Sequence, residues 1–318
     1  MPAVSIVVLN YNGKHFLETC LKSLERQDFQ DFEVLLVDNG STDGSLEYVQ
    51  EKFPSVRVIS LAENLGFCGG NNVGIGEARG EYVALLNNDA EADPNWLGEL
   101  KGTLDAHSDV GFCASKMFLR DQPEIIDTAG GIFYSCGVGG QRGCLEKENG
   151  RFTELEYVFS ACAGAAMYRK TMLDEIGLFD DKFFAHGEEF DLSFRAQLRG
   201  YKCLFVPSAV VYHAAGGTLN RDSDERRYLW HRNRNYVLIK NMPTGLLLKN
   251  LFPIVAYSFL RDMAWLLRGK ARLVLRIKLD SLKNFKCMVQ KRKHIQRSRR
   301  VSSQYLDSIM EKKWWSAL

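Results

Sequence analysis

The residues best suited to chemistry follow residues 82–86, a short apolar segment with the composition of a buried strand. Asn87, Asn88 and Asp89 come directly after it. Open α/β sheets bind ligands at the carboxyl ends of their strands, and amide and carboxylate oxygens there suit a hard divalent cation that holds phosphates. The same three residues would also suit a polar turn before the next helix. Other parts of the chain decide between these two interpretations.

Two more strand-like segments end in oxygen-bearing side chains. Residues 4–9 are followed by Asn10 and Asn12, and residues 34–37 are followed by Asp38. Because the carboxyl ends of parallel strands lie along one edge of a sheet, we expect these residues to meet the polar residues that end the third segment. This convergence favours the metal site over the polar turn.

A cluster of acids begins a later helix. Glu188, Glu189 and Asp191 fall in the first turn of an amphipathic segment that ends at a glycine. The positive end of the helix dipole stabilises acids in this position, but three of them are more than a helix cap requires. His213 follows a strand-like segment at residues 209–212, so its imidazole is a candidate metal ligand.

The elements that must position these residues alternate in the order that builds a parallel sheet. We expect strands at residues 4–9, 34–37, 56–61, 82–86 and 110–117, and helices at 14–27, around 46–53 and at 94–107. The density of glycine in residues 120–156 predicts loops or a β-excursion. Short strands at 203–206 and 209–212 then precede a helix at 225–240. The pattern predicts an α/β domain over residues 1–240.

Composition and charge divide the chain at about residue 240. The 318 residues are 46% hydrophobic and 25% charged, as is usual for soluble globular proteins. Residues 1–239 carry 12 more acids than bases, whereas residues 240–318 carry 14 more bases than acids. We expect no cleavable leader. The eight scattered cysteines contain no C-x-x-C pair, which indicates neither a zinc site nor a disulfide framework, so we expect reduced thiols in the cytoplasm.

Residues 241–318 form a separate unit in this interpretation, a basic and amphipathic helical tail. Charged residues interrupt its apolar segments, so we expect no span of about 20 residues across a bilayer. Leucines mixed with arginines and lysines at residues 265–278 fit helices that lie on an anionic membrane surface. The same helices could instead pack on the first domain or form a homo-oligomer. We expect no nucleic-acid partner, because no binding motif accompanies basic residues 286–300.

Five motifs occur in an order that is typical of one enzyme family. They are VSIVVLNYN at residues 4–12, VDNGSTDGS at 37–45, NLGF at 64–67, LLNND at 85–89 and GEE at 187–189. Over residues 3–240 the chain resembles an inverting family 2 glycosyltransferase of the GT-A fold, of the bacterial rhamnosyltransferase-like kind. The resemblance implies a Rossmann-like nucleotide-binding sheet with helices on both faces.

The resemblance also implies roles for the matching residues. Asp38 would hold the base or the ribose of a nucleotide sugar, while Asp89 and His213 would bind Mg²⁺ or Mn²⁺. Glu189 would be the catalytic base, with Glu188 as the second candidate. Contacts to the sugar donor are implied for the remaining loop residues, Asn10, Asn12, Asn64, Gly66, Asn87 and Asn88. The chain departs from the family at Asn87 and Glu189, where an aspartate is usual.

The function implied is a metal-dependent transfer of a sugar, rhamnose or another hexose, with inversion of configuration. The donor would be a dTDP- or UDP-sugar, and the acceptor a hydroxyl of a glycan or lipid-linked glycan in cell-surface polysaccharide synthesis, at the inner face of the cell membrane. One alternative is a transferase-like scaffold that has lost activity. A second is a dinucleotide-dependent oxidoreductase, suggested by the glycines of residues 74–80, although their spacing is G-x-G-x-x-x-G and they do not follow the first strand.

Overall fold

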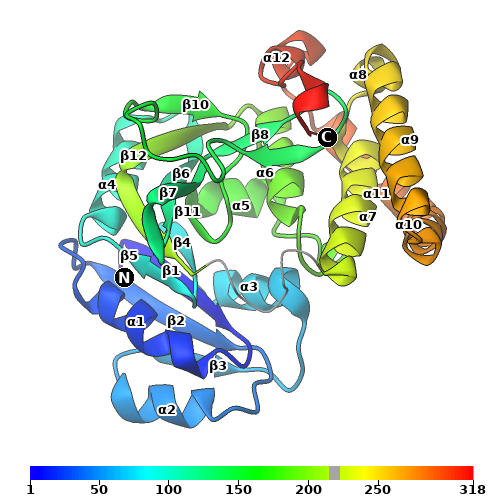
Figure 1. Cartoon of the computed structure of the whole chain (residues 1–318). Coiled ribbons are helices and arrows are strands. Elements are labelled where there is room, and N and C mark those ends of the chain that lie inside the picture. Colours follow the sequence, from blue (N-terminus) through cyan, green and yellow to red (C-terminus); the bar gives the residue numbers. More distant parts are fainter. Residues whose placement is uncertain (215–222, 318) are drawn as a thin grey trace.

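A large mixed sheet forms the centre of the molecule (Figure 1). The computed structural model describes residues 1–214 and 223–317. Within these residues ten strands make one sheet, in the order β10-β12-β6-β11-β4-β1-β2-β3, with β5 beside β12 and β7 beside β6. The strands are β1 Val4–Asn10, β2 Phe32–Asp38, β3 Arg57–Ser60, β4 Tyr82–Asn87, β5 Ala90–Ala92, β6 Val110–Leu119, β7 Gln122–Ala129, β10 Glu156–Val158, β11 Ala165–Arg169 and β12 Lys202–His213.

The first half of the sheet is parallel and follows the alternation seen in the sequence. β1 lies between β2 and β4, and β2 pairs with β3. The register places Asn10 opposite Asp38 and Leu9 opposite Asn87. The three strands β1, β2 and β4 therefore end at the same level, which confirms the predicted α/β class and its shared edge.

The second half of the sheet departs from a purely parallel arrangement. β11 runs antiparallel between β4 and β6. Residues 203–206 and 209–212, expected as two strands, belong to the single strand β12, whose pairing with β6 is irregular between Val206 and Val210. Pro207 accounts for this irregularity, because it has no N–H to donate to the ladder. Residues 120–156 contain β7 and a separate hairpin, β8 Gly131–Phe133 with β9 Gly139–Gln141.

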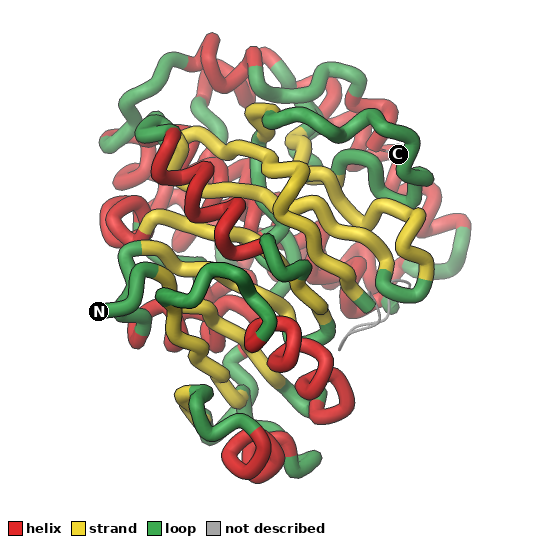
Figure 2. Tube along the Cα trace, turned by 90° about the vertical axis from the view of Figure 1, so that its left-hand side faces the viewer, coloured by secondary structure: helices red, strands yellow, loops and turns green. Residues whose placement is uncertain are grey.

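Helices cover both faces of the sheet, as Figure 2 shows. One face is covered by α1 Lys14–Glu25, α2 Ser45–Lys52 and α4 Trp96–Ala106, and the other by α3 Gly66–Glu77, α5 Lys170–Ile176 and α6 Glu188–Arg199. Alternate residues of β1 divide between two cores, because successive side chains of a strand point to opposite faces. Ile6 and Val8 pack with α1, whereas Val7 packs with α3.

The glycines of residues 74–80 lie in and after a helix and not in a strand-to-helix turn. Gly74 and Gly76 are inside α3. A Cβ atom on Gly74 would lie 2.4 Å from the Val7 side chain, so the glycine permits close packing of α3 on β1. The dinucleotide interpretation of this segment is therefore wrong.

The tail is a set of helices packed beside the sheet (Figure 1). α7 Asp224–Asn241 leads into the tail, whose helices are α8 Thr244–Lys249, α9 Leu251–Leu267, α10 Ala271–Lys283, α11 Phe285–Arg297 and α12 Ser303–Ser308. α7 packs against α10 and α11, and buried Asp180 accepts bonds from Lys240 of α7 and Lys291 of α11. The division at residue 240 stays a prediction from the sequence. In the described part of the chain, no helix combines the length and apolarity that a membrane span requires.

Candidate active site

The loops after β1, β2 and β4 form one hydrogen-bonded group. Asn10 is fully buried, and its Nδ2 donates to Asp38 Oδ1 at 3.3 Å and to Ser41 Oγ at 3.2 Å. Asn88 Nδ2 in turn donates to Asn10 Oδ1 at 2.7 Å. Asn10 thus uses its whole amide within the protein, and it positions Asp38 and Asn88 while having no surface of its own for a ligand.

Asp38 lies beside an open hollow of about 470 Å³. The wall of the hollow includes Ser41, Thr42 and Ser60. Asn12 holds this wall in place, because its Oδ1 accepts the Thr42 N–H at 2.8 Å and its own N–H donates to Ser41 Oγ at 2.9 Å. The hollow offers a carboxylate and several hydroxyl groups to a polar ligand.

A short strand pairing brings Asp89 to His213. β5 begins one residue after Asp89 and pairs antiparallel with the end of β12, so that Ala90 lies opposite His213. Asp89 and His213 are therefore neighbours across the ladder, and His213 Nε2 lies 3.2 Å from Asp89 Oδ1. The two predicted metal ligands, 124 residues apart in the chain, share one site. Asn87 Nδ2 lies 3.4 Å from the same imidazole nitrogen.

Asp127 of β7 holds the other side of the imidazole, with its Oδ2 2.8 Å from His213 Nδ1. Burial lowers the pKa of His213, but the bonds to Asp127 and Asp89 outweigh it and raise the pKa to about 9. A carboxylate on one imidazole nitrogen, with the second nitrogen facing another carboxylate, is the arrangement in which proteins present histidine to a metal. These residues therefore fit a divalent cation held by Asp89 and His213, although no cluster of three or more acid, His or Cys ligands occurs among the described residues.

The loop before α6 has a strained backbone. Phe184 and His186 have φ values of 65° and 67°, and Gly187 has a φ of 85°. Left-handed conformations are costly for residues other than glycine, of the order of 1–3 kcal/mol each, and they cluster at functional sites. Asn233 of α7, which is fully buried, stabilises this loop by donating to the carbonyl oxygens of residues 183, 185 and 186.

Asn64 and Gly66 support the same loop from the opposite side. Asn64 Oδ1 accepts bonds from Asn39 Nδ2 at 2.9 Å and from the Gly66 N–H at 2.8 Å. Gly66 has a φ of 74°, and a Cβ atom there would lie 2.5 Å from the Phe184 ring. Glycine is required at this position because the loop approaches so closely. The structure therefore places both residues in a scaffold between the loop after β2 and the loop before α6.

Glu188 and Glu189 begin α6 and are both buried. Glu189 Oε2 accepts the Gly187 N–H at 3.0 Å, while Glu188 Oε2 has no hydrogen-bond partner within the described residues. Burial raises the pKa of Glu189 to about 7. Burial, together with the charge of Glu189, raises the pKa of Glu188 well above its usual value. The bond from the Gly187 N–H favours the ionised form of Glu189, which suits it as a proton acceptor.

The segment before β11 contacts the end of β4. The Gly164 carbonyl accepts the Asn87 N–H at 2.8 Å. Burial raises the pKa of the nearby Cys162 thiol, and the negative charges of Glu189 and Asp127 raise it further.

Sequence reasoning missed three residues of this region. Asp127 lies in the glycine-rich segment that had no regular pattern, Asn39 was one residue in a turn motif, and Asn233 is a polar residue inside a helix. Their roles depend on contacts with residues 25 to 86 positions away in the sequence, and no local pattern signals such contacts. Asp191, which was counted with the acids of α6, is fully buried and bonds Lys240 and Arg195.

The mixed sheet and its helical layers have the GT-A fold that known glycosyltransferases share. The family model described as glycosyl transferase family 2 matches residues 5–177, and the model of glycosyl transferase family group 2 matches residues 153–278. The chain belongs to glycosyl transferase family 2. This confirms the resemblance seen in the sequence.

Known proteins of similar sequence and structure agree with this family. The chain is 25% identical over 264 residues to N-acetylglucosaminyl-diphospho-decaprenol L-rhamnosyltransferase of Mycobacterium tuberculosis, a match that covers 76% of this chain and 85% of that protein. GalNAc-T7, crystallised with UDP, GalNAc and Mn²⁺, superposes with a TM-score of 0.58 at 18% identity, over 76% of this chain and 51% of that one.

A mannosyltransferase from Pyrobaculum calidifontis, in complex with GDP-Man and Mn²⁺, superposes with a TM-score of 0.54 at 17% identity, over 94% of this chain and 86% of that one. At these identities the two structures show a common fold. The chain spans about a third of the length of several curated relatives that it matches.

Proposed function

We propose that this protein transfers a sugar from a nucleotide diphosphate donor to a hydroxyl of a glycan or lipid-linked glycan, with inversion of configuration and with Mg²⁺ or Mn²⁺ bound. The observation that carries the proposal is the contact of Asp89 with His213 at the strand ends, 3.2 Å apart. The proteins compared above support it, because two are named with a nucleotide or nucleotide sugar and Mn²⁺, and a third is named as an L-rhamnosyltransferase on a lipid diphosphate.

The donor would lie along the edge where the three strands end. Asp38 and the hollow beside it suit the base and ribose, since a carboxylate accepts hydrogen bonds from ribose hydroxyls or a base N–H. Asn88 and Asn87 lie between this hollow and His213, so the diphosphate would cross them. The relative that is named as an L-rhamnosyltransferase favours rhamnose as the transferred sugar.

Asp89 and His213 would hold the cation, and Asp127 would keep the imidazole in the orientation that faces it. When bound, a divalent cation neutralises the charge that develops on a leaving diphosphate. Asn87 supplies a neutral amide where the family usually has a carboxylate. The site therefore has one negative charge fewer than is usual in the family. The Asn87 amide still lies next to His213.

Glu189 would accept the proton of the attacking hydroxyl as the new glycosidic bond forms. Its raised pKa of about 7 makes it a stronger base than an exposed glutamate while leaving much of it ionised at neutral pH. One displacement at the anomeric carbon, with attack opposite the leaving group, inverts the configuration. This single step needs no covalent intermediate and no second nucleophile.

A panel of nucleotide sugars tests the proposed reaction. The full chain is incubated with dTDP-, UDP- and GDP-sugars in MnCl₂ or in EDTA, and release of the nucleoside diphosphate is measured with and without candidate acceptors. We expect release from one nucleotide class only, dependent on the metal. Equal release in EDTA would contradict the metal-dependent mechanism, and absence of release from every donor would favour the alternative of an inactive scaffold.

The location at a membrane is also proposed, and it rests on α9. Every exposed residue of this helix is hydrophobic, with Phe252 75% exposed and Leu267 82% exposed. Its two charged residues, Arg261 and Asp262, are buried at 9% and 8% exposure and bonded to each other. Helices on soluble proteins show the opposite pattern, with charges outward and apolar residues inward.

The surroundings of α9 favour an anionic bilayer over a second protein as the partner of this face. From Met263 to Arg300 the sequence has thirteen lysines or arginines and one acid, Asp280. Exposed leucines of α10 at positions 275, 279 and 282 alternate with these bases. Inserted apolar side chains contribute about 1.5–3 kcal/mol each, and bases near an anionic surface about 1 kcal/mol each. We therefore propose that α9 and α10 lie on the inner face of the cell membrane.

A further inference from the structure

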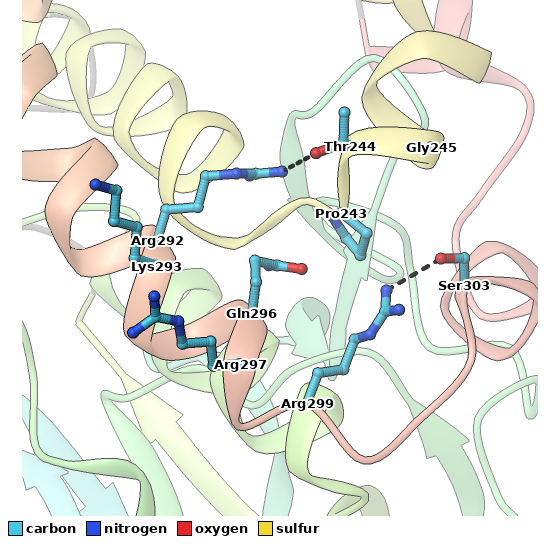
Figure 3. A pocket seen from close by; sticks show the side chains of 9 residues that line it. All are labelled: Pro243, Thr244, Gly245, Arg292, Lys293, Gln296, Arg297, Arg299 and Ser303. Atoms are coloured by element: carbon cyan, nitrogen blue, oxygen red, sulfur yellow. Dashed lines mark hydrogen bonds between the residues drawn. The ribbon is translucent and has the colours of Figure 1, made fainter.

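A second hollow lies at the far end of α7 from the catalytic loop (Figure 3). It has a volume of about 510 Å³ and lies between α11, the start of α8 and the segment that leads into α12. Asn233, which holds the loop before α6, is nine residues before Met242 at this end of α7, and nine helical residues span about 14 Å. The hollow is therefore separate from the candidate active site.

Four cations line this hollow, and acids are missing from its wall. The lining residues are Pro243, Thr244, Gly245, Arg292, Lys293, Gln296, Arg297, Arg299 and Ser303. None of the four basic side chains has a carboxylate partner among the residues that the structure describes, whereas Lys291 and Arg300, immediately beside them, are paired with Asp180 and Glu175. Carboxylates of residues 1–214 and 223–317 therefore leave the positive charge around the hollow uncompensated.

Two of these cations are fixed in place by neutral oxygens. Arg292 donates to the carbonyl oxygens of Ile239 and Met242 and to Thr244 Oγ1, at 2.9, 2.6 and 2.9 Å. Arg299 donates to Ser303 Oγ at 3.1 Å (Figure 3). These bonds hold the guanidinium groups at the hollow without neutralising them. Lys293 and Arg297 belong to α11, as Arg292 does. Their long side chains are able to turn toward a ligand.

We propose that this hollow binds a phosphate-bearing ligand. Arg299 and Arg297 hold the phosphate oxygens, and the positive charges of Arg292 and Lys293 add to the electrostatic attraction. Guanidinium groups bind phosphate oxygens through paired, charge-assisted hydrogen bonds, which are stronger than neutral ones. Concave sites lined by charges of one sign raise the local concentration of the opposite ion. Four uncompensated cations favour a ligand with two or more negative charges.

The phosphate could belong to a lipid headgroup or to a soluble molecule, and the position of the hollow bears on this. Thr244 and Gly245 line it, and three residues further along α8 the exposed side chain of Leu248 begins the apolar face that continues into α9. A lipid phosphate bound in the hollow would thus lie near the face proposed to contact the bilayer. The site itself does not depend on the proposed transfer reaction.

Calorimetry with inorganic pyrophosphate tests the site in the full chain. EDTA is present throughout, so that a metal-dependent donor site does not contribute. The double variant Arg297→Ala, Arg299→Ala removes two cations of the hollow, and the control Arg268→Ala, Arg272→Ala removes two exposed arginines of the tail that lie outside it. We expect the first variant to bind pyrophosphate at least about tenfold more weakly than the wild type and the control to bind as the wild type does.

Equal weakening in both variants would show a diffuse charge effect and overturn the proposal, as would absence of binding to the wild-type chain. Thermal unfolding of each variant checks that the fold is intact, and Arg299→Lys should restore part of the affinity. Flotation with phosphatidylglycerol vesicles then identifies the source of the phosphate. Displacement of the wild type from vesicles by pyrophosphate assigns the site to a lipid headgroup, and unchanged flotation assigns it to a soluble phosphate.

Discussion

Glu189 is a buried carboxyl group whose protonation controls the proposed reaction. Burial raises its pKa to about 7, so below that pH it carries the proton that it would have to accept. We expect kcat/KM to rise with pH through about 7 and then to level off. Glu189→Gln should lower kcat by about 10²–10⁴-fold while the donor binds as before. Near-normal turnover of this variant would move the role to Glu188.

The same carboxyl group should cost the protein stability at high pH. The pKa is raised on folding, so its contribution is favourable below the unfolded value of 4.5 and is lost as pH rises through about 7. Glu189→Gln keeps an acceptor for the Gly187 N–H and carries no charge. At pH 8 we expect it to be more stable than the wild type by up to about 3 kcal/mol in urea unfolding, with little difference at pH 4.5. An equal difference at both pH values would contradict this assignment of the charge.

At the scale of elements, α7 fixes the loop that presents α6. Asn233 donates to three carbonyl oxygens of that loop, at residues 183, 185 and 186. Asn233→Ala would leave buried acceptors unpaired, which we expect to cost about 1–3 kcal/mol in urea unfolding and to lower kcat more than it raises the KM of the donor. Asn235→Ala is the matched control, because its partner is Ser281 Oγ, away from the loop. Equal effects of both substitutions would argue against the role of Asn233.

The sequence predicted the elements that repeat locally and missed those that depend on distant partners. The strands β1, β2 and β4 and the start of α6 were found, because apolar runs and turn residues mark their ends. β11 was not predicted, since the alanine and glycine residues at and before its start carry no clear strand pattern. The resemblance to the family implied that Asp89 and His213 meet, but nothing in the sequence indicated Asp127, because only the β6–β7 pairing brings it to the imidazole.

At the scale of the whole molecule, α9 should decide whether the protein binds membranes. Phe252→Glu with Phe259→Glu places two charges on its exposed face. We expect the wild type to float with phosphatidylglycerol vesicles, less so at high salt, and the double variant to remain in solution. Leu155→Glu is the control, because it charges an exposed leucine of the catalytic body. Flotation of the double variant at the wild-type level would contradict the membrane proposal. If the wild type is a dimer, dissociation of that dimer by the two substitutions with no change in flotation would contradict it as well.

The tail is also tied to the catalytic body by buried ion pairs. Asp180 accepts bonds from Lys240 and Lys291, which hold its pKa below the usual value even though burial opposes this. A lowered pKa stabilises the fold above the unfolded value, and this contribution is lost as pH falls below about 4. Lys291→Met should therefore lower the free energy of unfolding at pH 7. At pH 3 the free energies of unfolding of the variant and the wild type should differ by less. If urea titrations gave the same difference in free energy of unfolding between variant and wild type at pH 7 and at pH 3, this linkage would be contradicted.

The central claim is that a cation held by Asp89 and His213 binds the diphosphate of the sugar donor. Calorimetric titration of UDP, dTDP and GDP into the full chain, in MnCl₂ and then in EDTA, tests it most directly. We predict that one nucleotide binds in MnCl₂ and loses affinity in EDTA, and that Asp89→Ala abolishes the metal-dependent part. Glu91→Ala, which removes a half-buried carboxylate paired with Arg26, should leave that part unchanged. Binding to Asp89→Ala with the wild-type affinity in MnCl₂ would contradict the account.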